Sequence, residues 1–281
     1  MFNTTALVSC QALKQHLGSP KLLVLDASVQ KVVGKTPIDY DAFYCLPNSQ
    51  HIDLDDSFHD KSSSYAHTMP SAEQFNAQAQ ALGVRRDSTI VIYDNQGIYS
   101  APRAWWMFKV MGFEQVYVLD GGLPAWVAND YAVDTKYTSV PLGDIQLTSS
   151  PKKVSTFTDV LASIAKQDTH IVDARSAGRF NGTSPEPRAG LRSGHIPSSI
   201  NLPFARVLSD DGLHFRDVTT LNQLFEDMAI ANKSQNLIAS CGSGMTACIV
   251  ILAAYLSGYR NLSLYDGSWS EWGANTSLPI E

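Results

Sequence analysis

The sequence predicts an α/β fold made of two tandem domains, each a parallel sheet with helices on both faces. Three observations support this prediction: the length, an internal repeat, and short apolar runs that lead into helical patterns. The chain has 281 residues, and at roughly 150 residues per domain this length suggests about two domains.

Three segments of the first half return in the same order in the second half. KLLVLDAS at 21–28 resembles THIVDARS at 169–176, STIVIYDN at 88–95 resembles QNLIASCG at 235–242, and VYVLDGGLPAW at 116–126 resembles LSLYDGSWSEW at 262–272. Their aligned aspartates or cysteine are separated by 147, 147 and 146 positions. A nearly constant offset indicates a duplicated domain. We expect a first domain at 1–131, a linker rich in Thr, Ser and Pro at 132–153, and a second domain at 154–281.

Within each copy, continuous apolar strands precede helices, which is typical of a parallel sheet covered on both faces. The run IVIY at 90–93 leads into a helical pattern in which Pro102 fits the first turn. The run LIA at 237–239 leads into a helix predicted over 246–256, which Ser257 and Gly258 would end.

Composition and charge exclude several classes of function. The chain is 44% hydrophobic and 17% charged, with a net charge of −6, so we expect no nucleic-acid partner and no membrane partner. No apolar stretch reaches the roughly 20 residues that a membrane span needs. The four cysteines form no C-x-x-C pair and no zinc-like cluster, so we expect no metal. Together with an N-terminus that lacks a secretory signal, they predict a reducing, cytoplasmic compartment.

The residues that carry chemistry follow the second apolar strand of the second copy. Cys241 opens a loop that contains Gly242 and Gly244, and a helix begins after it. Such a loop directs backbone N–H groups at the sulfur and stabilises a thiolate. The matching residue of the first copy is Asp94, so we expect one catalytic site per chain. A C-x5-R phosphatase would need arginine where this chain has Ala247, which argues against that chemistry.

Four segments together resemble the tandem rhodanese sulfurtransferases, and within them the bacterial 3-mercaptopyruvate branch: SCGSGMTA at 240–247, YDGSWSEWG at 265–273, SAPRAWW at 100–106 and GHIP at 194–197. The resemblance implies two rhodanese-like domains and a Cys241 that carries sulfur as a persulfide. It implies no metal or organic cofactor. The expected partners are 3-mercaptopyruvate as donor and a thiophilic acceptor, such as cyanide, a thiol or a dithiol protein.

The loop residues favour one sulfur donor over another. Family members that use thiosulfate carry cations at the two positions after the cysteine, whereas this chain has the neutral Gly242 and Ser243. Arg179 and Arg188 match the family's carboxylate-binding arginines, and arginine pairs with a carboxylate through two parallel hydrogen bonds. We expect the donor site to be completed by the other loop residues, Gly242, Gly244, Met245 and Thr246. The alternatives are a thiosulfate sulfurtransferase and a non-catalytic rhodanese-like thiol sensor or binding module.

Ser243 is a candidate catalytic residue with two interpretations. It could donate a hydrogen bond to the developing enolate, or it could only shape the loop. In related enzymes this serine has been argued to extend through a histidine and an acid of the first domain. This chain has Cys45 in the motif position of that histidine, which leaves the relay without its expected member. Cys248, seven residues after Cys241, is interpreted as a small core residue, with a redox partner as the alternative.

Overall fold

The computed structural model describes residue 2 and residues 6–281, which form two compact units. The first unit contains the chain up to Lys61, Met69–Ser149 and Ser209–Phe215. The second contains Ser62–Thr68, Ser150–Leu208 and Arg216–Glu281. Each unit therefore includes one short segment from the other half of the sequence.

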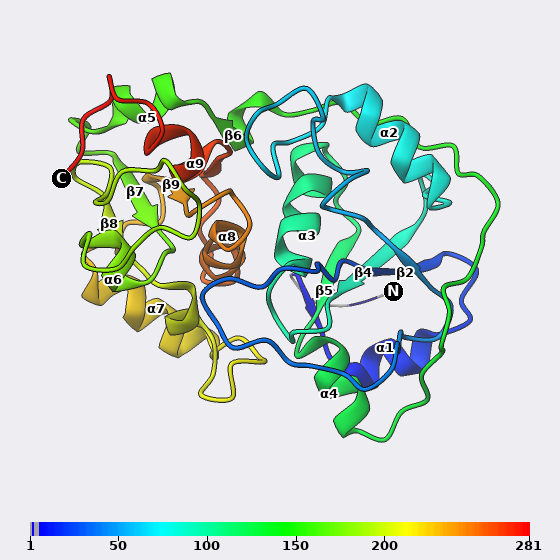
Figure 1. Ribbon diagram of the computed structural model, residues 1–281. Helices are drawn as coiled ribbons and strands as arrows, with labels where there is room; N and C mark the ends of the chain where they lie inside the picture. The colour runs from blue at the N-terminus through cyan, green and yellow to red at the C-terminus, as the bar shows by residue number, and fades with distance from the viewer. Residues whose placement is uncertain (1, 3–5) are drawn as a thin grey trace. The chain divides into compact units, whose positions relative to one another are not determined.

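The first unit is built on a parallel five-stranded sheet in the order β1-β5-β4-β2-β3 (Figure 1). Its strands are β1 Leu7–Val8, β2 Leu22–Asp26, β3 Ser49–His51, β4 Thr89–Tyr93 and β5 Val116–Leu119. Its helices are α1 Cys10–His16, α2 Ala72–Ala81, α3 Ala101–Val110 and α4 Gly122–Ala128. The central strand β4, TIVIY, is buried at every position, as expected for a strand covered on both faces.

The second unit repeats this sheet in the order β6-β10-β9-β7-β8, again parallel. Its strands are β6 Val154–Ser155, β7 Thr169–Asp173, β8 Ile200–Asn201, β9 Asn236–Ser240 and β10 Leu262–Tyr265. Its α-helices are α5 Phe157–Ser163, α6 Ala177–Phe180, α7 Val218–Asp227, α8 Ala247–Leu256 and α9 Ser268–Trp272, and the 3₁₀ turns are η1 Pro151–Lys153 and η2 Phe204–Val207. The predicted fold class, two α/β units with parallel sheets, is confirmed.

The sequence repeat is visible element by element. Helices α1 and α5 are offset by 147 residues, as are β4 and β9, whereas α3 and α8 are offset by 146. The loop between β4 and α3 is consequently one residue longer than the loop between β9 and α8. These two loops occupy the same place in the repeat, and the second one contains Cys241.

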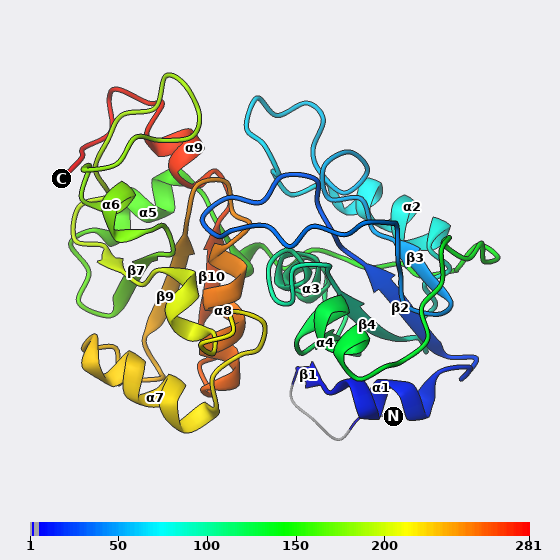
Figure 2. The same cartoon turned by 60° about the horizontal axis from the view of Figure 1, so that its bottom comes forward.

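Both helices that follow these loops form where the sequence predicts them. Pro102 lies in the first turn of α3, where its missing N–H costs no hydrogen bond. Helix α8 ends at the cap residue Ser257, and Gly258 adopts a φ of +95°. Apart from its C-terminal end, α8 is buried, and it packs along β9 and β10 (Figure 2). The Cys241 loop therefore stands between a central strand and a core helix.

The segment after α4 runs in extended form over the first unit. Cys45 and Asp134 exchange two backbone hydrogen bonds of 2.9 and 2.8 Å, and the Thr138 N–H donates to the Ser49 carbonyl at 2.9 Å. Ile145 is buried in the same segment. These contacts fix the chain between α4 and η1 to the first unit.

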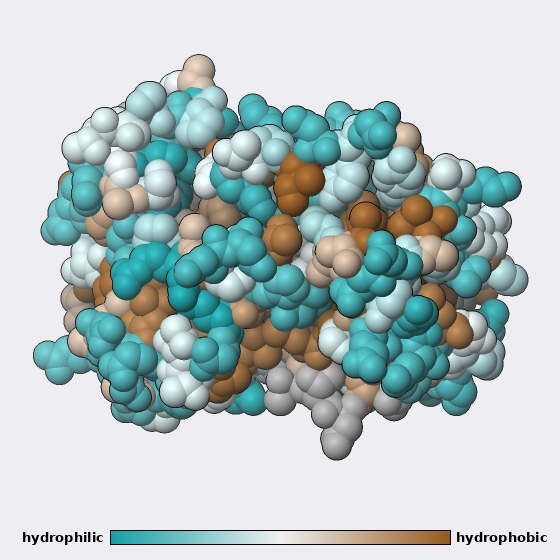
Figure 3. Space-filling model, turned by 90° about the horizontal axis from the view of Figure 1, so that it is seen from below, coloured by the Kyte–Doolittle hydropathy of each residue, from teal (hydrophilic) through white to brown (hydrophobic). Residues whose placement is uncertain are grey.

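Among the described residues, none of the helices combines the length and the apolar character that crossing a bilayer requires. The face shown in Figure 3 is largely hydrophilic, with smaller apolar patches between polar side chains.

Candidate active site

Cys241 is the first residue after β9, and its free thiol is buried. The carbonyls of this loop are held by α9: the Trp269 N–H donates to the Cys241 carbonyl at 3.0 Å, and the Ser270 N–H and hydroxyl donate to the Gly242 carbonyl at 2.9 and 2.6 Å. In a planar trans peptide the N–H points away from the carbonyl of the same unit. The N–H groups of Gly242 and Ser243 therefore point away from α9.

The backbone donors of the loop are open. The N–H groups from Ser243 to Ala247 donate no hydrogen bond to any described residue. Gly244 supplies a φ of +76°, a left-handed conformation that glycine adopts without strain. A helix start with unpaired N–H groups attracts negative charge. The loop is thus prepared for an anion next to Cys241, and Met245 and Thr246 contribute to it through their backbone.

The first unit shows what such a loop holds. Asp94 is fully buried, and its carboxylate accepts four backbone N–H bonds of 2.8–2.9 Å from Gln96, Tyr99, Ser100 and Ala101. The Leu123 N–H donates to the Asp94 carbonyl at 3.0 Å, just as Trp269 does to Cys241. Burial raises the pKa of Asp94, and the four N–H bonds act against that rise. Where the second unit has the thiol of Cys241, the first unit has a carboxylate that accepts hydrogen bonds from the corresponding loop N–H groups.

Asp94→Asn is expected to destabilise the first unit by about 2–3 kcal/mol, because one amide oxygen cannot replace two carboxylate oxygens that accept four buried N–H bonds. Urea denaturation measures this loss. Asp130→Asn makes the same chemical change at an exposed position and should change stability by less than about 0.5 kcal/mol. Equal stability of the two variants would contradict a structural role of the Asp94 carboxylate.

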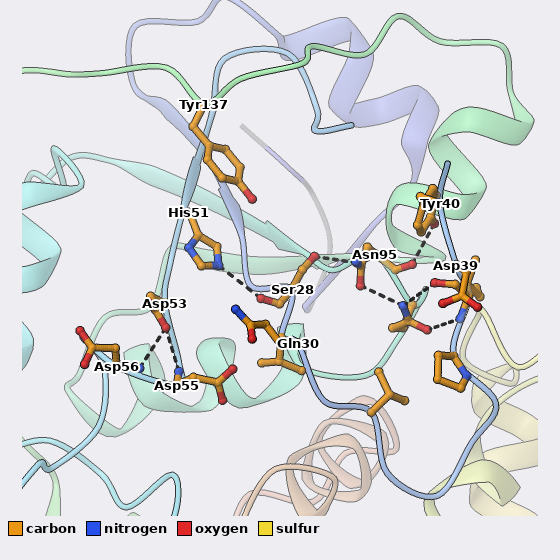
Figure 4. A pocket seen from close by; sticks show the side chains of 15 residues that line it. Ser28, Gln30, Asp39, Tyr40, His51, Asp53, Asp55, Asp56, Asn95 and Tyr137 are labelled. Atoms are coloured by element: carbon orange, nitrogen blue, oxygen red, sulfur yellow. Dashed lines mark hydrogen bonds between the residues drawn. The ribbon is translucent and has the colours of Figure 1, made fainter. Parts of the chain in front are cut away.

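A cavity of about 580 Å³ lies at the same end of the first sheet (Figure 4). Ser28, His51 and Asn95 border it, each at or just beyond the carboxyl end of a strand. Its acidic side chains are Asp39, Asp53, Asp55 and Asp56. These carboxylates make the cavity acidic, and among them Asp56 pairs with Lys61 at 2.8 Å.

The two candidate donor-binding arginines border the Cys241 loop. A Cβ atom placed on Gly242 would lie 3.0 Å from Arg179 Nη2 and 3.6 Å from Arg188 Nη1. A side chain at position 242 would therefore press against both guanidinium groups, and glycine leaves the space in front of them open. Arg188 forms no ion pair within the described chain, so its charge is available to a ligand.

Sequence reasoning missed the acid that holds Arg179. Glu186 lies in the same loop as Arg188, and its carboxylate accepts from Arg179 Nη2 at 2.6 Å and Nε at 3.2 Å. It also accepts from the buried Arg175 at 2.8 Å, and Arg175 forms a multidentate pair with Asp173 at the end of β7. These ion pairs hold the Arg179 side chain in a fixed position. The available signal was the PEPR sequence, in which an acid stands two residues before Arg188.

Ser243 has a histidine partner that the sequence analysis did not identify. The Oγ atom of Ser243 lies 2.9 Å from His67 Nδ1, and both residues belong to the second unit. His67 adopts a φ of +63° in the segment Ser62–Thr68. Cys45 is instead buried in the first unit, where its thiol contacts the carbonyls of Asp134 and Lys136. Ser243 therefore has a histidine partner even though position 45 is a cysteine, because His67 contacts it.

Cys248 lies within α8 and is buried, in agreement with its interpretation as a core residue. Its thiol donates to the Gly244 carbonyl at 3.2 Å, one turn earlier. This contact ties the Cys241 loop to the first turns of α8. The structure thus brings Cys241, Ser243, Arg179 and Arg188 together in one unit, with His67 and Glu186 added.

The chain is similar to proteins of one family. The Rhodanese-like domain family matches residues 9–129 and 156–275. A 3-mercaptopyruvate sulfurtransferase from Rattus norvegicus is 38% identical over 275 residues, covering 95% of this chain and 91% of the rat protein. A thiosulfate sulfurtransferase from the same organism is 36% identical, with the same coverage. A crystal structure of a 3-mercaptopyruvate sulfotransferase from Escherichia coli superposes with a TM-score of 0.81 at 31% identity, covering 95% of this chain and 99% of that one.

Proposed function

Because the chain belongs to the rhodanese-like family and carries that domain twice, we propose that it is a sulfurtransferase that moves sulfur from 3-mercaptopyruvate, through a persulfide on Cys241, to a thiophilic acceptor. The observation that carries the proposal is the loop of Cys241, with open N–H donors on one side and two guanidinium groups at Gly242. In this proposal the first domain, 1–131, has no nucleophile of its own and contributes His67, and the second domain, 154–281, beyond the linker 132–153, holds Cys241, Ser243 and the two arginines.

In the first step, the Cys241 thiolate attacks the sulfur of 3-mercaptopyruvate. A sulfur–sulfur bond forms while the carbon–sulfur bond of the donor breaks. The bonding electrons go to the carbon skeleton, which leaves as the enolate of pyruvate and takes up a proton at carbon. The open N–H groups of residues 243–247 stabilise the negative charge on the outer sulfur of the persulfide.

Three side chains hold the donor during this step. Arg188 supplies the unpaired positive charge for the donor carboxylate, and Arg179, held by Glu186, supplies further N–H groups beside it. Ser243 donates to the carbonyl oxygen, which becomes the enolate oxygen, and the His67 ring, 2.9 Å from Ser243 Oγ, orients the serine hydroxyl.

In the second step, an acceptor nucleophile attacks the outer sulfur of the persulfide and releases the Cys241 thiolate. Two half-reactions through a covalent intermediate give ping-pong kinetics. Cyanide serves as acceptor in an assay, and a thiol or a dithiol protein is the acceptor class that this chemistry supports in a cell.

Thiosulfate is the alternative donor, and the similarity to a thiosulfate sulfurtransferase is nearly as high. Gly242 and Ser243 argue against it, because neither adds positive charge for a dianion. A rate comparison of the two donors on the unmodified protein decides between them, since faster turnover of thiosulfate would overturn the donor assignment. Mass spectrometry decides whether the protein is a catalyst or a sensor, since a catalyst gains one sulfur atom from the donor and loses it to cyanide.

Arg188→Ala and Arg179→Ala are each expected to lower kcat/KM for 3-mercaptopyruvate by about 10- to 150-fold, the cost of one charge-assisted hydrogen bond of roughly 1.5–3 kcal/mol. The loss with Arg179→Ala should be the larger one, because it also leaves the Glu186 carboxylate without one of its two arginines, close to an anionic donor. Steady-state kinetics measure both values.

Thiosulfate is the matched control for the arginine variants, because it has no carboxylate to anchor. Its kcat/KM should fall less than that of 3-mercaptopyruvate. Equal losses on both donors would point to a general electrostatic role and contradict a carboxylate clamp.

A further inference from the structure

The second unit has a cavity of about 710 Å³ at the amino ends of its strands. Asn236, at the start of β9, lines this cavity, whereas Cys241 follows the other end of the same strand. Five residues of strand span on the order of 13 Å, so the cavity is a separate place from the sulfur-transfer site. It lies against α5 and the turn η1.

Buried serine hydroxyls line this cavity. The Oγ atoms of Ser155 and Ser263 lie 2.5 Å apart, and both residues are more than nine-tenths buried. One hydroxyl donates to the other, so one O–H proton of the pair is left, and it has no acceptor among the described residues. Ser163, also buried, lines the cavity from α5. The cavity therefore has small polar side chains where a core would place apolar ones.

The first unit fills the matching place with large side chains. By the repeat offset, Ser155, Ser163 and Ser263 correspond to Val8, His16 and Tyr117. There the ring of Phe2 packs on those of His16 and Tyr117, with centroids 4.9 and 5.4 Å apart. The duplicated fold does not itself require a cavity here, because one copy is packed and the other is hollow.

Positive charge surrounds the hollow copy. The charged residues that line the cavity are Lys152, Lys153, Lys166, Arg260 and a single acid, Asp159. The Asp159 carboxylate caps α5 by accepting the N–H and hydroxyl of Thr156 at 2.8 and 2.7 Å, and these bonds hold its pKa below the usual value. The lining of this cavity is therefore positively charged, although the net charge of the chain is −6.

One of the four cations is held in place. Arg260 Nη1 donates to the carbonyls of Tyr255 and Tyr259 at 2.8 and 2.7 Å, and its guanidinium lies 4.2 Å from the centre of the Tyr255 ring. Its counterpart in the first unit is Glu114, which pairs with Lys109. The charge at this position is therefore opposite in the two units.

We propose that this cavity binds a phosphate-bearing small molecule of about nucleotide size. The volume falls within the range of roughly 300–1,000 Å³ that is typical of small-molecule sites. A diphosphate group matches an excess of positive charge, and its oxygens accept hydrogen bonds from lysine, arginine and serine donors. This proposal does not depend on the sulfur-transfer chemistry at Cys241.

Isothermal titration of the full chain with ADP, inorganic pyrophosphate and adenosine tests the proposal. ADP and pyrophosphate should bind saturably and more weakly as salt increases, and adenosine should not bind. Tighter binding of ADP than of pyrophosphate identifies a nucleoside phosphate, and equal binding identifies the phosphate groups alone; both support the site. An absence of saturable binding by ADP and pyrophosphate overturns it.

Two variants locate the binding. Arg260→Glu should weaken pyrophosphate at least tenfold, and Ser263→Tyr should do the same without changing charge, by restoring the side chain of the first unit. Lys233→Glu reverses an exposed charge of the same unit outside the cavity and should change affinity less than twofold. Sulfur transfer by each variant reports its folding. Unchanged binding in a folded Arg260→Glu variant overturns the proposal, whether or not Ser263→Tyr folds.

Discussion

Cys241→Ser is expected to reduce sulfur transfer from 3-mercaptopyruvate to the background rate, a loss on the order of 10⁵- to 10⁶-fold, as for other enzymes that lose their nucleophile. A serine hydroxyl ionises far less readily than a thiol and cannot hold a persulfide. The fold should be retained, because the loop is fixed through its carbonyls by α9 and not through the sulfur. Transfer to cyanide measures activity, and mass spectrometry measures the sulfur adduct.

Cys248→Ser is the matched control. Its thiol donates to a backbone carbonyl that a serine hydroxyl also reaches, so most of the activity should remain. Comparable losses in the two variants would show a dithiol mechanism and remove the assignment of a single nucleophile.

The sequence predicted those features that depend on local pattern. The repeat offset predicted two units with the same element order, and α3 and α8 begin within one or two residues of their expected starts because proline and loop glycines mark them. The place of Cys241 followed from a strand, a glycine-containing loop and a helix in direct succession. Such features need no information about distant residues.

The features that sequence reasoning missed depend on contacts across long separations. His67 and Ser243 are 176 positions apart, and His67 stands in a segment without helical or strand periodicity. The family motif suggested position 45, yet the chain folds that residue against the strand-like segment at Asp134. Glu186 was missed for another reason: the sequence indicated a ligand for Arg179 and Arg188 but did not indicate that this acid pairs with Arg179.

The set of open N–H groups beside Cys241 was predicted only in part. The convergence of N–H groups on the first loop residue was expected from the loop composition. The loop is held in this conformation by N–H groups of α9 that donate to its carbonyls, and α9 follows β10 in the sequence. Asp94 shows what these donors can hold, because its carboxylate accepts from the corresponding N–H groups of the first unit.

Ser243→Ala and His67→Ala are each expected to lower kcat for 3-mercaptopyruvate by about 10²- to 10³-fold, the usual cost of removing one donor to a developing oxyanion. The physical reason is the 2.9 Å contact between Ser243 Oγ and His67 Nδ1: without the histidine, the hydroxyl loses the group that orients it toward the enolate oxygen. Single-turnover formation of the persulfide isolates this step from sulfur transfer to the acceptor.

The double variant Ser243→Ala/His67→Ala distinguishes a relay from two separate roles. If the histidine acts only through the serine, the double variant should be no slower than either single variant, because residues that act as a unit are not additive. His67→Gln keeps a side-chain amide that can hydrogen-bond to the serine hydroxyl, so it should recover part of the kcat that His67→Ala loses. Thiosulfate, which forms no enolate, should be affected less by both changes. Losses that multiply in the double variant, or that are equal on the two donors, would leave Ser243 as a residue that only shapes the loop.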